Sequence, residues 1–199
     1  MADYILVHGA RNDGSVWDEV VSLLQERGQR AFAPTLSGPE DVDLDDNISE
    51  VCDIITRENL DKVVLVGHSY AAMVITGVVD RMPERIKNLV FIDSAVPASG
   101  KSLFDMIESY GVSTAEYGLE PERPFTEPLY FDEERMRRIP KTYIHCTESE
   151  FLEAGKAAFR HVVEHTERDR WDFFELETDH HCMVSEPRKV AEILLWEGA

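Results

Sequence analysis

The most constraining feature of this sequence lies at residues 63–71, where an apolar run ends in Gly-His-Ser-Tyr-Ala. The run predicts a buried strand, and the small and apolar residues that follow predict a helix over about 70–82. Because Gly67 and Ala71 are small, strand and helix can cross closely and hold Ser69 on a tight, strained turn with its hydroxyl exposed. This setting is typical of a nucleophile elbow; the alternative is that Ser69 only caps the helix.

Apolar strand-like runs alternate with amphipathic helices along the chain, which is the pattern of a doubly wound α/β sheet. We predict a mostly parallel sheet of six strands, over residues 4–8, 30–33, 62–67, 87–93, 142–147 and 172–176. Further helices are predicted over about 16–27, 48–59, 150–165 and 187–196, with Ser15 as the N-cap of the first. At 199 residues, the chain is expected to form one domain, 1–199, with a sizeable buried core.

Residues 99–140 interrupt this alternation. Prolines are frequent in and beside this stretch and disfavour long regular elements: Pro97, Pro121, Pro124, Pro128 and Pro140. We interpret about 99–140 as a short irregular lid over a site rather than as a second domain. Its larger apolar side chains either line a pocket or pack the lid onto the core: Phe104, Met106, Tyr110, Leu129, Tyr130 and Phe131.

The chain is strongly acidic, with 39 Asp and Glu residues against 20 Lys and Arg and a formal net charge of −19. Such a surface repels phosphate backbones and anionic membranes, so neither nucleic acid nor a membrane is expected as a partner. No apolar run approaches the ~18 residues of a membrane span, and the N-terminus carries no signal-like segment. We therefore expect a soluble cytoplasmic protein. No coiled-coil repeat indicates an assembly, which leaves a monomer or a homodimer.

The cysteines and one histidine pair bear on metals and disulfides. Cys52, Cys146 and Cys182 are odd in number and widely spaced, which argues against a disulfide framework and against a four-ligand zinc site. His161 and His165 stand four apart on a predicted helix without a third ligand, so we interpret them as part of a solvated face. We expect neither a metal nor an organic cofactor.

In doubly wound sheets, ligands bind beyond the carboxyl ends of the strands, so the residues after each strand are candidates for a site. The first strand is followed by Gly9 and Ala10. A glycine there lets the backbone turn sharply beside Ser69, and the amide of Ala10 could join that of Tyr70 as an oxyanion hole. The alternative is an ordinary strand-to-helix connection with a turn glycine.

The last strand is followed by two consecutive histidines. A serine hydroxyl needs an adjacent base, and histidine can take and return a proton near neutral pH. His180 is the candidate base, because it lies late in the chain at the carboxyl end of the sheet. His181 is the alternative, since a shift of one position in the strand end would exchange the two. A metal site at this pair is a further alternative, although no ligand cluster at zinc spacing accompanies it.

Together these motifs resemble the α/β-hydrolase superfamily. In chain order they are Gly9-Ala10 followed by Trp17, the Gly-His-Ser-Tyr-Ala elbow, the strand 89–93 before Val96-Pro97, and His180 before Met183-Val184. Within the superfamily, the chain most resembles small bacterial hydrolases related to plant methyl-ester esterases and hydroxynitrile lyases. The resemblance implies that Ser69 is the nucleophile and His180 the general base and then acid. It also implies that the amides of Ala10 and Tyr70 form the oxyanion hole.

The chain departs from this family where relatives often place the triad acid. After the strand 142–147, Ser149 stands at that position. A triad histidine needs a carboxylate to fix its tautomer, so another residue should supply it. Asp93 is the preferred candidate, with a placement similar to that in some haloalkane dehalogenases of this superfamily; Glu148 and Glu150 are the alternatives. Asp93 could instead cap a turn.

Other members of the superfamily carry out other reactions. Plant-type hydroxynitrile lyases use a threonine near the first strand end and a lysine after the histidine, where this sequence has Gly9 and His181. Arg11 and its neighbours occupy a stretch where relatives commonly carry an aromatic, which predicts a more polar pocket wall. We predict a serine hydrolase, a carboxylesterase that cleaves small esters through an acyl-enzyme on Ser69. The alternatives are a catalytically weak binding protein of the same fold and a hydroxynitrile-lyase-like enzyme.

Overall fold

The computed structural model describes residues 2–40 and 42–198, so residues 1, 41 and 199 of the predicted domain lie outside the described residues. The described residues form a six-stranded sheet in which every pairing is parallel, in the order β2-β1-β3-β4-β5-β6. The strands are β1 Asp3–Val7, β2 Arg30–Phe32, β3 Val63–His68, β4 Ile86–Ile92, β5 Lys141–Cys146 and β6 Trp171–Leu176. The predicted doubly wound sheet is confirmed, and each predicted strand end lies within one residue of the observed one.

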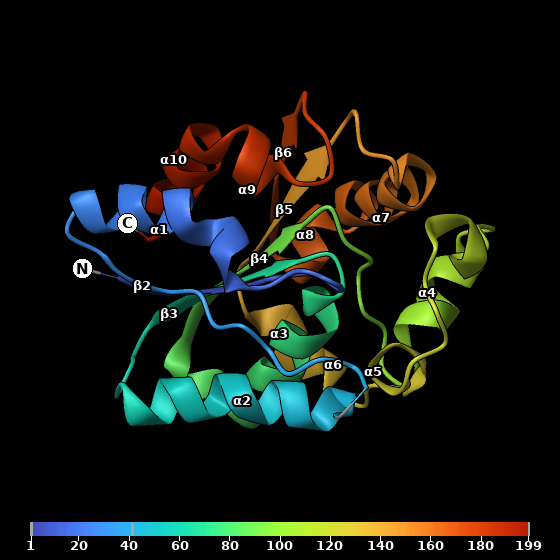
Figure 1. Ribbon diagram of the computed structural model, residues 1–199, viewed down its shortest axis with the longest axis horizontal. Helices are drawn as coiled ribbons and strands as arrows, with labels where there is room; N and C mark the ends of the chain where they lie inside the picture. The colour runs from blue at the N-terminus through green and yellow to red at the C-terminus, as the bar shows by residue number, and fades with distance from the viewer. Residues whose placement is uncertain (1, 41, 199) are drawn as a thin grey trace.

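Helices cover both faces of the sheet (Figure 1). One face carries α1 (Asp18–Glu26), α9 (Cys182–Ser185) and α10 (Pro187–Gly198). The other carries α2 (Leu44–Arg57), α3 (Ala71–Arg81) and α7 (Leu152–Glu164). A short helix, α8 (Thr166–Asp169), precedes β6. Within the described residues, no helix combines the length and the apolar character needed to cross a bilayer.

The central strand shows why two helical layers are needed. Every residue of β3 is buried. Val63 and Leu65 belong to the apolar core under α2 and α3, whereas Val64 and Val66 belong to the core under α1 and α10. Because successive strand side chains point to opposite faces, a strand that is apolar on both faces is stable only when both are covered.

Two helix starts differ from the prediction. α2 begins at Leu44, four residues before the predicted start, because Asp43 and Asp46 form a capping box. Each of these carboxylates accepts the backbone N–H of the other residue, at 3.0 and 2.9 Å. The prediction that Ser15 caps the first helix is wrong. Asp13 is the N-cap of a 3₁₀ turn, Gly14–Trp17, that leads into α1, and its carboxylate accepts the Ser15 N–H at 2.8 Å.

The segment between β4 and β5 is more regular than predicted. It contains α4 (Leu103–Ser109), a 3₁₀ turn at Thr114–Tyr117, α5 (Arg123–Thr126) and α6 (Glu133–Arg138). A capping box between Ser102 and Asp105 starts α4. α5 packs against α2 and α6 against α3, so part of this segment extends the helical layer.

Five of the six apolar side chains predicted for the lid pack onto the core. Met106 and Leu129 are buried in it, and Phe104, Tyr110 and Phe131 lie against it. Tyr130 is 73% exposed. None of these six residues lines the cavity beside Ser69, to which the same segment contributes other residues.

A short stem joins the two ends of this segment. The Gly100 N–H donates to the carbonyl oxygen of Leu129 at 2.7 Å, and the Leu129 N–H donates to that of Lys101 at 3.0 Å. The Ser99 hydroxyl donates to the carbonyl oxygen of Phe131 at 2.9 Å and accepts the Phe131 N–H at 3.0 Å. The chain between the two halves of the stem therefore leaves and rejoins the fold at one place.

Candidate active site

Ser69 occupies the sharp turn between β3 and α3. Its φ is +54°, in the left-handed region that residues other than glycine rarely adopt. The Ser69 N–H donates to the carbonyl oxygen of Ile92 at 3.0 Å, which ties the turn to the end of β4. A Cβ at Gly67 would lie 2.8 Å from the carbonyl oxygen of Ala71, so glycine is required for α3 to start this close to the strand.

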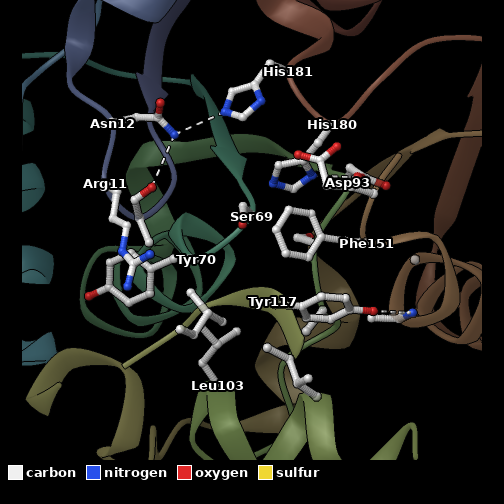
Figure 2. Close-up of a pocket in the computed structure, with 18 residues that line it drawn as sticks. Arg11, Asn12, Ser69, Tyr70, Asp93, Leu103, Tyr117, Phe151, His180 and His181 are labelled. Carbon is white, nitrogen blue, oxygen red and sulfur yellow. Dashed lines mark hydrogen bonds and ion pairs between the residues drawn. The ribbon is translucent and has the colours of Figure 1, made fainter. Parts of the chain in front are cut away.

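The structure brings His180 and Asp93 together beside Ser69 (Figure 2). Nδ1 of His180 lies 2.6 Å from Oδ2 of Asp93, and both side chains are buried. His180 follows β6 and Asp93 follows β4, and both line the cavity that contains Ser69. With Nδ1 donating to the carboxylate, Nε2 is left as a proton acceptor. The Ser69 hydroxyl makes no hydrogen bond to a described residue, and such catalytic hydrogen bonds often tighten only with substrate.

Neighbouring donors fix the carboxylate of Asp93. The Ser149 hydroxyl donates to Oδ2 at 2.5 Å, the same oxygen that meets His180. The Cys146 N–H donates to Oδ1 at 3.4 Å. Nδ1 of His145 lies 3.9 Å from Oδ1. Ser149, where relatives suggested an acid, therefore acts as a donor that holds Asp93 in place.

The alternative residues named from the sequence do not meet the partners that their roles require, although Glu150 and His181 line the cavity. Glu148 and Glu150 are exposed, and neither hydrogen-bonds to His180. Nε2 of His181 lies 3.4 Å from the side-chain nitrogen of Asn12, and His181 makes no hydrogen bond to Asp93 within the described chain. Of the candidates for base and acid, the structure pairs only His180 with Asp93 among the residues it describes.

The turn after β1 and the turn after β3 each bring one candidate oxyanion residue, Ala10 and Tyr70, to the cavity. The His8 ring donates from Nδ1 to the carbonyl oxygen of Gly9 at 2.8 Å and accepts the Leu36 N–H on Nε2 at 3.0 Å. A Cβ at Gly9 would lie 3.0 Å from Cβ of Ser69, so glycine lets this turn approach the elbow. The amides of Ala10 and Tyr70 donate no hydrogen bond within the described chain, and both residues line the cavity.

His68 is a residue of the site that the sequence did not single out. Its Nε2 donates to the carbonyl oxygen of His180 at 2.9 Å, and the two rings lie 4.3 Å apart. Nδ1 is buried without a hydrogen-bond partner among the described atoms. Burial, together with the nearby His180 and His181, holds the pKa of His68 well below its usual range. His68 is therefore neutral and anchors the backbone of the histidine that meets Asp93.

The neutral state of His68 predicts a pH dependence of stability. Below about pH 6.5, the unfolded chain binds a proton at this residue and the folded chain does not. The free energy of unfolding therefore keeps its full value above that pH and decreases as the pH falls. The His68→Gln variant keeps a donor for the His180 carbonyl and does not titrate. We expect wild type to lose about 1.4 kcal/mol per pH unit relative to this variant between pH 6.5 and 5. Urea unfolding at several pH values measures the difference, which should stay constant above pH 7; a constant difference at all pH values would contradict a neutral His68.

The cavity has a volume of about 350 Å³ and two unlike walls. The apolar wall comes from α4, from the turn that follows it and from the start of α7, and it includes Leu103, Ile107, Tyr117, Leu119 and Phe151. The polar wall carries Arg11, Asn12 and His181. The polar character predicted for the turn after β1 is thus present at the cavity.

Two further pairs of side chains, apart from those discussed above, are in contact with each other. Cys146 and Cys182, at the end of β5 and the start of α9, have hydrogen-bonded thiols, and this contact together with burial raises the pKa of Cys146. All three cysteines are free. The rings of His161 and His165 lie 4.3 Å apart, and the described residues include no group of three or more His, Cys, Asp or Glu side chains suited to a metal.

The strand order and the elbow define an α/β hydrolase as the structural class. Over residues 4–193, the chain matches the model of the alpha/beta hydrolase family, and it belongs to that family. It is 41% identical over 115 residues to a carbendazim hydrolyzing esterase of Nocardioides sp. (strain SG-4G), which covers 54% of this chain and 48% of that protein. It is 34% identical over 108 residues to a pyrethroid hydrolase of Sphingobium wenxiniae, covering 50% and 38% of the two chains. The chain thus matches about half the length, or less, of these relatives.

Solved structures agree in fold. An extracellular alpha/beta-hydrolase from a Paenibacillus species superimposes with a TM-score of 0.79 at 24% identity, over 100% of this chain and 99% of that chain. Polyneuridine aldehyde esterase superimposes with a TM-score of 0.76 at 20% identity, over 98% of each chain. At these identities, the likeness concerns the fold.

Proposed function

We propose that this protein is a serine hydrolase that cleaves small carboxylic esters through an acyl-enzyme on Ser69. The observation that carries the proposal is the 2.6 Å contact between buried Nδ1 of His180 and Oδ2 of Asp93, in the cavity that also contains Ser69. A carboxylate on Nδ1 fixes the tautomer in which Nε2 can accept the serine proton. The relatives named as a carbendazim hydrolyzing esterase and a pyrethroid hydrolase support ester hydrolysis.

The proposed reaction proceeds in two halves. Oγ of Ser69 attacks the ester carbonyl carbon while Nε2 of His180 takes its proton, and the negative charge develops on the carbonyl oxygen. The amides of Ala10 and Tyr70 donate to that oxygen, and each such donor contributes about 3 to 4 kcal/mol to the transition state. His180 then protonates the departing alcohol. Water, deprotonated by His180, attacks the acyl-enzyme and restores Ser69 with release of the acid.

The alternatives have less support. The binding-protein hypothesis depended on a missing acid, and the contact between Asp93 and Nδ1 of His180 supports Asp93 as that acid. For a hydroxynitrile-lyase-like reaction, the positions of interest hold Gly9 and His181, neither of which supplies a hydroxyl or an ammonium group.

Labelling with a fluorophosphonate tests the proposal, run beside a p-nitrophenyl ester series of increasing acyl length. We expect stoichiometric labelling and turnover of the short esters. Absence of both would refute the serine-hydrolase proposal, and consumption of cyanohydrins but not of esters would favour the lyase.

We further propose a cytoplasmic location and a monomer or homodimer. The free thiols of the adjacent Cys146 and Cys182 fit a reducing compartment. The substrate is a small molecule, and the net charge of −19 disfavours nucleic acid and anionic membranes as partners.

A further inference from the structure

A second cavity adjoins the one that contains Ser69. It has a volume of about 260 Å³ and is lined by residues 8–12, 36–39, Asn47, Tyr70 and 124–125; we call it the Arg11 recess. The two cavities share four lining residues, Ala10, Arg11, Asn12 and Tyr70. Two of these carry the proposed oxyanion donors, so a group bound in the Arg11 recess lies next to the ester carbonyl.

Arg11 is the group in this recess that remains available to a ligand. Of the described residues that line the recess, Arg11 is the only one of the types Asp, Glu, Lys and Arg. Several other polar side chains of the recess are already used: both ring nitrogens of His8 are hydrogen-bonded, and Asn47 binds the Tyr70 hydroxyl at 2.9 Å and the Ser37 carbonyl at 3.2 Å. Within the described chain, Arg11 makes neither an ion pair nor a hydrogen bond.

The position of Arg11 is set by a fixed turn. Its φ is +60°, and the Asn12 side chain donates to the carbonyl oxygen of Ala10 at 3.2 Å across it. The guanidinium reaches Gly118, where a Cβ would lie 3.8 Å from Nη1. An unpaired guanidinium at a cavity wall is unusual in a chain of net charge −19, in which many other arginines pair with carboxylates.

The chemistry of a guanidinium selects its ligand. Its planar fork of donors matches a carboxylate, and it cannot lose its charge near neutral pH. Figure 2 shows Arg11 and His180 on opposite sides of Ser69. Since His180 protonates the departing alcohol, the alcohol lies on its side and the acyl group on the side of Arg11.

We propose that Arg11 binds a carboxylate on the acyl part of the substrate, so that the preferred substrates are monoesters of dicarboxylic acids. This inference rests on the proposed ester hydrolysis. In such a substrate, the scissile carbonyl meets Ala10 and Tyr70, and the free carboxylate occupies the Arg11 recess. The apolar cavity wall near Phe151 then remains for the alcohol.

The test compares monomethyl adipate with dimethyl adipate in wild type, Arg11→Gln and Arg27→Gln. Arg27 is exposed and follows α1 at the opposite end of the sheet, so its variant removes the same charge far from the site. We expect Arg11→Gln to lower kcat/KM for the monoester by roughly 10- to 100-fold, the range for loss of a charge-assisted hydrogen bond, and to change the diester much less. Arg27→Gln should change neither.

The outcomes separate this inference from the proposed function. Equal losses on both esters, or no loss, would overturn the role of Arg11. Fluorophosphonate labelling without turnover of the monoester would also overturn it while leaving a serine hydrolase. Absence of labelling would refute the proposed function and this inference with it.

Discussion

The Ser69→Ala variant is expected to lose ester hydrolysis by about 10⁶-fold and all labelling by a fluorophosphonate, since the proposed nucleophile is removed. The fold should persist, because the Ser69 hydroxyl makes no hydrogen bond to a described residue. Turnover of p-nitrophenyl esters and circular dichroism measure the two effects. Ser113→Ala is a matched control, since Ser113 is exposed and its side chain caps no helix. Labelling that survives in Ser69→Ala would place the nucleophile at another residue.

The Asp93→Asn variant is expected to lower kcat by about 10⁴-fold while it keeps the shape of the site. An amide can hold the His180 ring in the wrong tautomer and does not stabilise the imidazolium that forms during turnover. Fluorophosphonate labelling should slow in parallel. A variant that keeps most of its activity would show that Asp93 does not orient His180 and would return Glu148 and Glu150 to consideration.

Ser149→Asp in the Asp93→Asn background is expected to raise kcat at least about tenfold above that of the Asp93→Asn variant. The Ser149 hydroxyl and Nδ1 of His180 both meet Oδ2 of Asp93, so position 149 lies at most two hydrogen-bond lengths from the histidine. A carboxylate there would take over the contact. Ser149→Asn in the same background is the matched control, because it adds the same bulk without charge. Equal activity of the two double variants would argue against relocation of the acid.

The sheet could be predicted from the sequence because its strands carry a strong local signal. Residues 63–66 are apolar on both faces and are followed by Gly67, a pattern that is typical of a buried strand next to a tight turn. The start of α2 carried a weaker signal, since Asp43 to Asn47 contains mostly polar residues that are equally common in loops. Its first turn depends on the reciprocal capping of Asp43 and Asp46, which periodicity does not detect.

The candidate site likewise contains residues that could be predicted from the sequence and residues that could not. Ser69 and Asp93 follow their strands directly and His180 lies in the loop after β6, so the topology of the sheet brings them to one edge and the sequence could name them. The roles of Ser149 and His68 depend on loop backbones that no local pattern specifies. The unpaired state of Arg11 likewise depends on the shape of two loops and of the start of α5.

The stem at Ser99 to Lys101 and Leu129 to Phe131 makes the intervening segment a replaceable cassette. Its two ends are bound to each other, so its length can change at a small entropic cost to the sheet, which grows only slowly with added residues. Ser69, His180 and Asp93 all lie outside it, whereas Leu103, Ile107 and other residues of the apolar wall lie inside it. New substrate preferences can therefore be introduced between the two halves of the stem while the proposed reacting groups stay on the rest of the fold.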